Sequence, residues 1–150
     1  MPDVFTQTQF SLSLINKPGV LAQVAGALAD EKVNIKALTL VDSQEHGVLR
    51  LVADNAGHAQ SVLAKLNLPM TQTDVLCLEL PNQPGVLADI AGLLGENHIN
   101  ISYAYCTSGA PGGRTTAIFK VADPKKAQQV LRGSMAKHKE PNVRRPGTRR

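Results

Sequence analysis

The sequence predicts an α+β protein in which two βαββαβ units lie side by side and share an antiparallel sheet, with helices on one face. The first observation is an internal repeat, because the segment 16–35 returns as 82–101, displaced by 66 residues. The second is a change of period within each copy. Apolar residues first alternate, as in a strand, and then recur at i, i+3 and i+4, as on one face of a helix.

The first unit begins with a strand and a helix. Alternating apolar residues end at Ile15, and Pro18 and Gly19 then turn the chain into the helix. A glycine inside this helix, Gly26, has a counterpart at Gly92 in the second copy, which predicts a close approach of both helices to the sheet. The stripe expected to face the core consists of Leu21, Val24, Ala25 and Leu28. In the second copy it consists of Leu87, Ile90, Ala91 and Leu94.

Two strands, 34–41 and 47–53, follow as a hairpin, and both are apolar on both faces. Such strands are typical of a sheet that is covered on both sides. We therefore expect a second subunit to cover the other face, so that the protein is a homodimer. Asp54 or Asn55 can cap the next helix, which ends at Pro69.

The second unit repeats this order but stops early. Its strand 75–80, its helix, its hairpin of 101–106 and 115–121 and its last helix after Asp123 all have counterparts in the first unit. The last helix of the first unit is followed by a short fourth strand at 70–73, whereas no such strand follows the last helix of the second unit. The triplet Thr-Gln-Thr occurs at 6–8 and again at 71–73, just before the first strand of each unit. This match predicts that residues 4–8 supply the missing fourth strand.

The predicted domains are therefore 4–69 and 70–136, followed by a basic, disordered tail at 137–150. The tail contains six basic residues and one acidic residue, so the net charge of +4 belongs to it and not to the folded units. A tail of this kind can bind phosphates loosely. The predicted strand 47–53 contains no aromatic residue on which a base could stack, which argues against a nucleic-acid-binding module.

Composition and motifs also argue against several classes of protein. Cys77 and Cys106 are too few and too far apart for a zinc site or a disulfide framework, and we expect both thiols to be buried in strands. The chain has no run of eighteen apolar residues and no signal peptide, so a cytoplasmic protein without a membrane partner is expected. No nucleophile elbow, phosphate loop or metal-binding motif occurs, so we predict neither an enzyme nor a cofactor.

Each unit has the ferredoxin-like arrangement, and its motifs resemble those of the ACT domain, a small regulatory module that binds amino acids. The motifs are the turn Asn-x-Pro-Gly-Val-Leu-Ala, the Ala-Gly pair in the helix and the Val/Ile-Asn-Ile segment that leads into the second strand. Two copies together resemble tandem ACT proteins. The resemblance implies an amino-acid sensor, or alternatively a non-catalytic regulatory subunit of a biosynthetic enzyme such as acetolactate synthase.

The resemblance also implies effector sites at the junction between ACT units, where a loop of one unit faces the second strand of its neighbour. Carried over to this sequence, the site residues of the loops are Asn16, Gly19, Val20 and Leu21 in the first copy and Asn82, Gly85, Val86 and Leu87 in the second. Those of the strands are Asn34, Ile35, Asn100 and Ile101.

Physical chemistry supports the same loops. A helix N-terminus offers unpaired backbone amides and partial positive charge to a carboxylate, and an asparagine side chain can both donate and accept hydrogen bonds. Glycine allows a ligand to approach the backbone closely. The alternative is that Asn16 and Asn82 only cap their helices and that the Pro-Gly pairs are only turns.

Overall fold

The computed structural model describes residues 3–43, 45–107 and 113–138, and the predicted order of strands and helices is confirmed. Most of the predicted basic tail and the tip of the second hairpin lie outside these residues. The helices are α1 (Val20–Asp30), α2 (Ala56–Ala64), α3 (Val86–Glu96) and α4 (Pro124–His138). The strands are β1 (Asp3–Ile15), β2 (Ile35–Ser43), β3 (His46–Ala53), β4 (Met70–Pro81), β5 (Ile101–Cys106) and β6 (Arg114–Val121).

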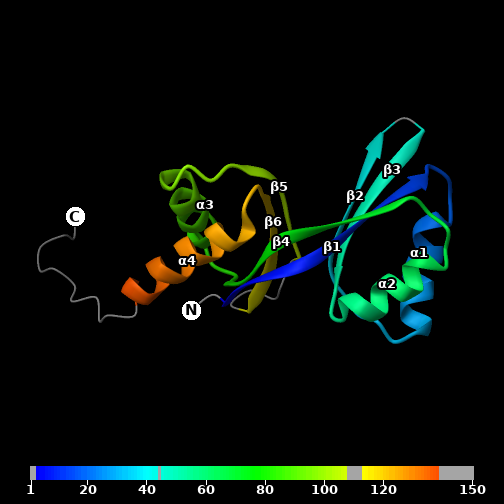
Figure 1. Ribbon diagram of the computed structural model, residues 1–150, viewed down its shortest axis with the longest axis horizontal. Coiled ribbons are helices and arrows are strands. Elements are labelled where there is room, and N and C mark those ends of the chain that lie inside the picture. The colour runs from blue at the N-terminus through cyan, green and yellow to red at the C-terminus, as the bar shows by residue number, and fades with distance from the viewer. Residues whose placement is uncertain (1–2, 44, 108–112, 139–150) are drawn as a thin grey trace, which may run out of the picture.

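The six strands form one antiparallel sheet in the order β2-β3-β1-β4-β6-β5 (Figure 1). Figure 1 shows α1 and α2 with one half of the sheet and α3 and α4 with the other half, while β1 and β4 run between the halves. The predicted α+β fold with two units that share a sheet is therefore confirmed. Within the described residues, every helix is too short or too polar to traverse a lipid bilayer.

The long strands β1 and β4 each contribute to both halves. Residues 4–8 pair with 78–74 of β4, which is the pairing that the repeated Thr-Gln-Thr triplet predicts. Farther along β1, residues 10–15 pair with 51–46 of β3. Residues 70–73 of β4 pair with 12–9 of β1, so they lie beside the first unit. Because the units exchange strands in this way, the division after residue 69 remains a prediction.

Each half of the sheet has its own core on the face that carries the helices. Alternate residues of β1 contribute to both cores, since Phe10, Leu12 and Leu14 pack under α1 and α2 whereas Val4 packs under α3 and α4. Side chains two residues apart on a strand point to the same face, so both pairs of helices cover one face. Thr6 lies between the two cores on this face and is exposed.

The opposite, helix-free face is closed in part by the curl of the sheet itself. β2 lies close to β5 and β6, and a third cluster forms there, which we call the helix-free cluster. It comprises Ala37, Val52, Val75, Cys77 and Ile118, with Phe5 and Tyr105 packed against it. The expectation that another subunit buries this face is wrong for Ala37 and Val52, because the twisted sheet covers them within one chain.

A polar contact joins the two halves beside this cluster. Gln9, the only buried polar residue in the described part of the chain, donates from Nε2 to the hydroxyl of Tyr103 (2.6 Å). Its Oε1 accepts a hydrogen bond from the hydroxyl of Tyr105 (2.7 Å). The guanidinium of Arg50, on β3, lies 4.2 Å from the ring centre of Tyr103. We call Gln9, Tyr103 and Tyr105 the glutamine clasp, because they tie β1 to β5.

Both cysteines lie in strands, but only one of them is buried. Cys77 belongs to the helix-free cluster, and burial raises the pKa of its thiol to about 11. The expectation of a buried thiol is wrong for Cys106, which is exposed at the end of the edge strand β5.

The predicted helical stripes begin one residue too late. The buried residues of α1 are Val20, Val24 and Leu28, whereas Leu21 is 37% exposed. The same shift occurs in α3, where Leu87 is 50% exposed. The glycine turn places the first helical residue, and not the second, over the sheet. Leu21 and Leu87 therefore lie at the surface beside the turns.

The close approach predicted for Gly26 and Gly92 is also wrong, because a Cβ atom at either position would meet nothing within 4 Å. We therefore expect Gly26→Ala and Gly92→Ala each to raise the free energy of unfolding by about 0.4–1 kcal/mol, since alanine has the higher helix propensity. Urea unfolding followed by circular dichroism would measure this. Gly19→Ala provides the contrast, since φ is +90° there, and it should destabilise the protein. Destabilisation by Gly26→Ala would contradict this interpretation.

Candidate ligand-binding site

The turn between β1 and α1 leaves the start of the helix uncapped by side chains. Gly19 occupies the N-cap position with φ of 90° and ψ of −11°, a left-handed conformation that glycine adopts without strain. None of the described side chains makes a capping hydrogen bond there. The amides of the first helical turn are thus available to an outside acceptor, and they carry the partial positive charge of the helix N-terminus.

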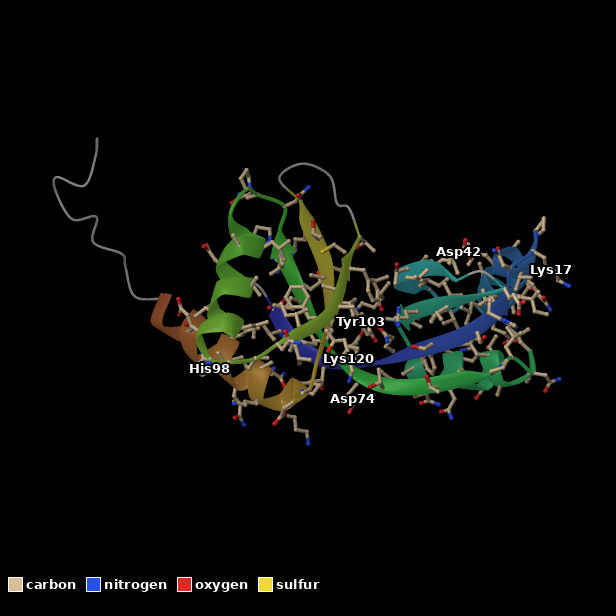
Figure 2. All side chains as sticks on the ribbon, turned by 90° about the horizontal axis from the view of Figure 1, so that it is seen from above. Lys17, Asp42, Asp74, His98, Tyr103 and Lys120 are labelled. Carbon is tan, nitrogen blue, oxygen red and sulfur yellow. The ribbon has the colours of Figure 1, made fainter. Side chains whose placement is uncertain are left out.

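A hollow of about 280 Å³ lies beside this turn. Its walls come from the end of β1, the turn, the start of α1, and the facing ends of β2 and β3. The lining residues are Leu14, Ile15, Asn16, Lys17, Gly19, Val20, Leu21, Leu40, Asp42 and Gly47. Figure 2 shows Lys17 and Asp42 in one half of the molecule and His98 in the other. The hollow thus combines one cation, one carboxylate and a helix N-terminus.

Asn16 holds the carboxylate of this hollow in place. Its Nδ2 donates a hydrogen bond to Oδ1 of Asp42 at 3.0 Å, across from the end of β2. The backbone amide of Asn16 donates to the carbonyl of Glu45 at 3.2 Å. The alternative that Asn16 only caps α1 is therefore wrong, because Gly19 takes the N-cap position. The side chain of Asn16 instead orients Asp42 toward the turn.

The rim of the hollow is apolar and exposed. Ile15 is 56% exposed, Leu21 is 37% exposed and Leu40 is 47% exposed. Exposed branched side chains around a polar centre are a feature of ligand-binding or protein-binding surfaces. This arrangement can hold a small molecule whose charged groups meet the helix N-terminus and Asp42 while its apolar part contacts the rim.

The second turn reproduces the backbone of the first. Gly85 has φ of 89° and ψ of −20° at the N-cap position of α3, and none of the described side chains caps that helix. The amide of Asn82 donates to the carbonyl of Gly113 at 2.8 Å. Val86 packs against the second core, whereas Leu87 is exposed. The repeat therefore preserves the shape of the turn in both units.

The strand residues that the resemblance implied lie elsewhere. In the register of β2 with β3, Ile35 pairs with Ala53, whereas Asp42 pairs with Gly47 at the opposite end. Asn34 donates its amide to Oδ1 of Asp54 (3.1 Å), and Ile35 packs against the first core. Asn100 is exposed before β5, and Ile101 packs against the second core.

The structure thus brings together Asn16, Gly19, Val20 and Leu21, and it places Asn34 and Ile35 at the far end of β2. Every lining residue belongs to the first unit, so the hollow does not lie between the two units of one chain. Among the described residues, no group of three or more His, Cys, Asp and Glu side chains could hold a metal ion.

Sequence reasoning missed six residues of the hollow, which are Leu14, Ile15, Lys17, Leu40, Asp42 and Gly47. Asp42 comes near Asn16 only through the register of β1, β3 and β2, which a repeat does not reveal. Lys17 could have been noticed, since the repeat places Gln83 at its equivalent position. A difference between otherwise similar copies was the available signal.

The fold and the repeated turns define this chain as a pair of ferredoxin-like units. It belongs to the ACT domain pair family, whose sequence pattern matches residues 5–140. The resemblance stated from the sequence is thereby confirmed. A comparison with curated protein sequences found no match.

Several solved structures are similar in fold. A protein from Bacteroides thetaiotaomicron shares 27% sequence identity, covers 88% of this chain and 90% of its own, and has a TM-score of 0.79. The ligand-free regulatory subunit of aspartate kinase from Thermus thermophilus is 16% identical and has a TM-score of 0.65. The match covers 88% of this chain and 95% of that subunit. Escherichia coli aspartokinase III, in complex with lysine and aspartate, is 20% identical over 91% of this chain and 32% of its own, with a TM-score of 0.53. For both kinases the similarity shows the fold.

Proposed function

We propose that this protein is a regulatory protein that binds a small amino acid at the turn between β1 and α1. The observation that carries the proposal is the hollow at an uncapped helix N-terminus, with Lys17 and Asp42 among its walls. Membership of the ACT domain pair family supports a regulatory role without catalysis. We further propose that the protein acts in the cytoplasm.

The proposed binding mode follows from the charges of an amino acid. Its carboxylate would accept hydrogen bonds from the amides at the start of α1, where Lys17 adds positive charge. Its ammonium would donate to Asp42, which Asn16 already orients. Its side chain would lie against the apolar rim. Binding would therefore need both the turn and the end of β2.

We propose that a second copy of the chain completes the site. β2 is an edge strand of the sheet, and its exposed residues Leu38, Leu40 and Val41 lie next to the hollow or along the same edge. A homodimer formed through this edge would bury these side chains and place the hollow at a junction between ACT units. In this arrangement the junction lies between chains and not within one chain.

The alternative is a regulatory subunit that binds a biosynthetic enzyme. Its support is the similarity in fold to regulatory subunits of aspartate kinase. Affinity purification of the tagged full chain from its own cells separates the two proposals. A stoichiometric catalytic partner would favour the subunit, whereas a homodimer that binds an amino acid by itself would favour the sensor.

RNA binding receives little support from the helix-free face, although Phe5, Tyr103 and Tyr105 gather there. Lys36 Nζ lies 4.7 Å from the ring centre of Phe5, and Arg50 stacks over Tyr103. The hydroxyls of both tyrosines are bonded to Gln9. RNA-binding sheets of this topology offer open ring faces for bases. Here the rings take part in contacts within the chain.

A thermal-shift screen of the full chain against the twenty amino acids tests the proposal. A ligand at 100 times its dissociation constant should add about 2.7 kcal/mol, which corresponds to a rise of roughly 5–10 °C in melting temperature. Asp42→Ala should abolish the shift, because it removes the acceptor for the ammonium.

Asp74→Ala is the matched control, because Asp74 is also exposed but lies on β4, away from the hollow. It should leave the shift intact. The proposal fails if none of the twenty amino acids raises the melting temperature of the unmodified protein.

A further inference from the structure

The two repeated turns have the same backbone but different charges. Gly19 and Gly85 share a left-handed conformation with φ of 90° and 89°. The residue after the asparagine is Lys17 in the first turn and Gln83 in the second. The first turn of α3 contains an acidic residue, Asp89, whereas α1 has Gln23 at the equivalent position and no acidic residue in its first turn.

These charge differences all favour binding of a carboxylate at the first turn over the second. A negative side chain in the first turn interacts favourably with the helix N-terminus, so Asp89 already neutralises part of the charge that a ligand would use. It also repels an incoming carboxylate. In the first unit Lys17 adds a positive charge at the hollow, and Asp42 supplies the opposite charge for an ammonium. Among the described residues, the first turn is thus the one whose neighbouring side chains match both ends of a zwitterion.

We propose that the duplicated turns are functionally unequal, so that each chain binds one ligand at the first turn and none at the second. This inference rests on the proposed function. Lys17 is then the residue that distinguishes the two turns. The second turn keeps the shape of the first, but it has Gln83 in place of Lys17 and Asp89 in place of Gln23.

The lining of the hollow also defines the class of ligand. One lysine and one aspartate match one carboxylate and one ammonium, and no further charged side chain of the described residues lines the hollow. The apolar part of the lining consists of Leu14, Ile15, Val20, Leu21 and Leu40, and Asn16, Gly19 and Gly47 complete it. A second charge on the ligand would gain no partner from these side chains, whereas an apolar side chain would remove the exposed rim from water. The ligand is therefore an α-amino acid with an uncharged, apolar side chain.

Isothermal titration calorimetry of the full chain with L-leucine tests the stoichiometry and the class together. We expect one L-leucine per chain. L-leucinamide, which lacks the carboxylate, and 4-methylpentanoate, which lacks the ammonium, should each bind at least tenfold more weakly. Two L-leucine molecules per chain would overturn the inequality of the turns. Equal affinity for the analogues would overturn the role given to the charges.

Variants then locate the site. Lys17→Gln gives the first turn the residue of the second and should weaken L-leucine binding about 1.5- to 5-fold, which is the range of an exposed charge contact. Gln83→Ala should change nothing, and Lys125→Gln controls for the loss of one positive charge. If Gln83→Ala weakens L-leucine binding and Lys17→Gln does not, the ligand binds at the second turn and the inference is overturned.

The outcomes separate this inference from the proposed function. If an amino acid with a polar or charged side chain binds but none with an apolar side chain does, the amino-acid site stands and the apolar class is wrong. If none binds, the proposed function itself fails.

Discussion

Removal of residues 1–8 should unfold the second half of the protein while α1 and α2 remain folded. Residues 3–8 pair with 79–74 of β4, and Val4 is 5% exposed within the second core. The side chains of Gln128 and Arg132 on α4 also donate to the carbonyl of Val4. Losing these hydrogen bonds and this burial should cost on the order of 5 kcal/mol. That is comparable to the whole stability of a small domain.

Amide hydrogen exchange would measure this loss residue by residue. Protection should collapse in α3, α4 and β6, whereas the core of Phe10, Leu12 and Leu14 should keep its protection. Two point variants on the same face of β1 provide a finer test. Val4→Asn should cost about 2–3 kcal/mol because it buries an amide, and Thr6→Asn should stay within about 0.5 kcal/mol because Thr6 is exposed. Equal loss of protection in both halves would contradict the claim that residues 4–8 act as the fourth strand of the second half.

Gln9→Leu should destabilise the protein by about 2–4 kcal/mol. Gln9 is 0% exposed, and its replacement leaves the hydroxyls of Tyr103 and Tyr105 without their partner on β1. An unsatisfied buried hydroxyl costs about 1–3 kcal/mol. Because β5 belongs to the second half and Gln9 to the long shared strand, the glutamine clasp should also hold the curl of the sheet.

The triple variant Gln9→Leu, Tyr103→Phe and Tyr105→Phe is the matched control for this effect. Removing both sides of a hydrogen bond is far less costly than removing one side. The triple variant should therefore recover at least half of the stability that Gln9→Leu loses, as measured by urea unfolding. If the triple variant instead loses as much stability as the three single variants together, the glutamine clasp contributes through packing and not through its hydrogen bonds.

Much of the fold could be predicted because local patterns determine it. The alternation of apolar and polar residues predicted the strands, and the Pro-Gly turns predicted the starts of α1 and α3. The Thr-Gln-Thr match predicted the pairing of 4–8 with β4. Residue spacing alone could not show which residue of a helix first meets the sheet. That depends on the left-handed glycine before it, which is why Leu21 and Leu87 were assigned to the core.

The curl of the sheet was beyond the sequence for a different reason. It depends on how twist accumulates over six strands until β2 meets β5 and β6, and no local pattern encodes this. The apolar residues on both faces of β2 and β3 are evident in the sequence. From the sequence, another chain is expected to bury the second face of these strands, whereas the same chain buries Ala37 and Val52.

The candidate site was predictable only on its loop side. The asparagine-glycine turn could be recognised from its repetition, whereas its facing wall could not, since Asp42 and Leu40 reach the hollow through strand register. The resemblance directed attention to Asn34 and Ile35, which lie at the other end of the same strand. An ACT unit of a second chain would have to supply the wall that the resemblance implies.

The measurement that tests the central claim most directly is amide chemical-shift mapping of the isotope-labelled full chain with the amino acid that binds best. The account predicts that the largest shifts fall on the amides of Gly19, Val20 and Leu21 and on the end of β2 near Asp42, with small shifts at the equivalent turn around Gly85. Large shifts at Gly85, or shifts confined to residues outside the hollow, would contradict it.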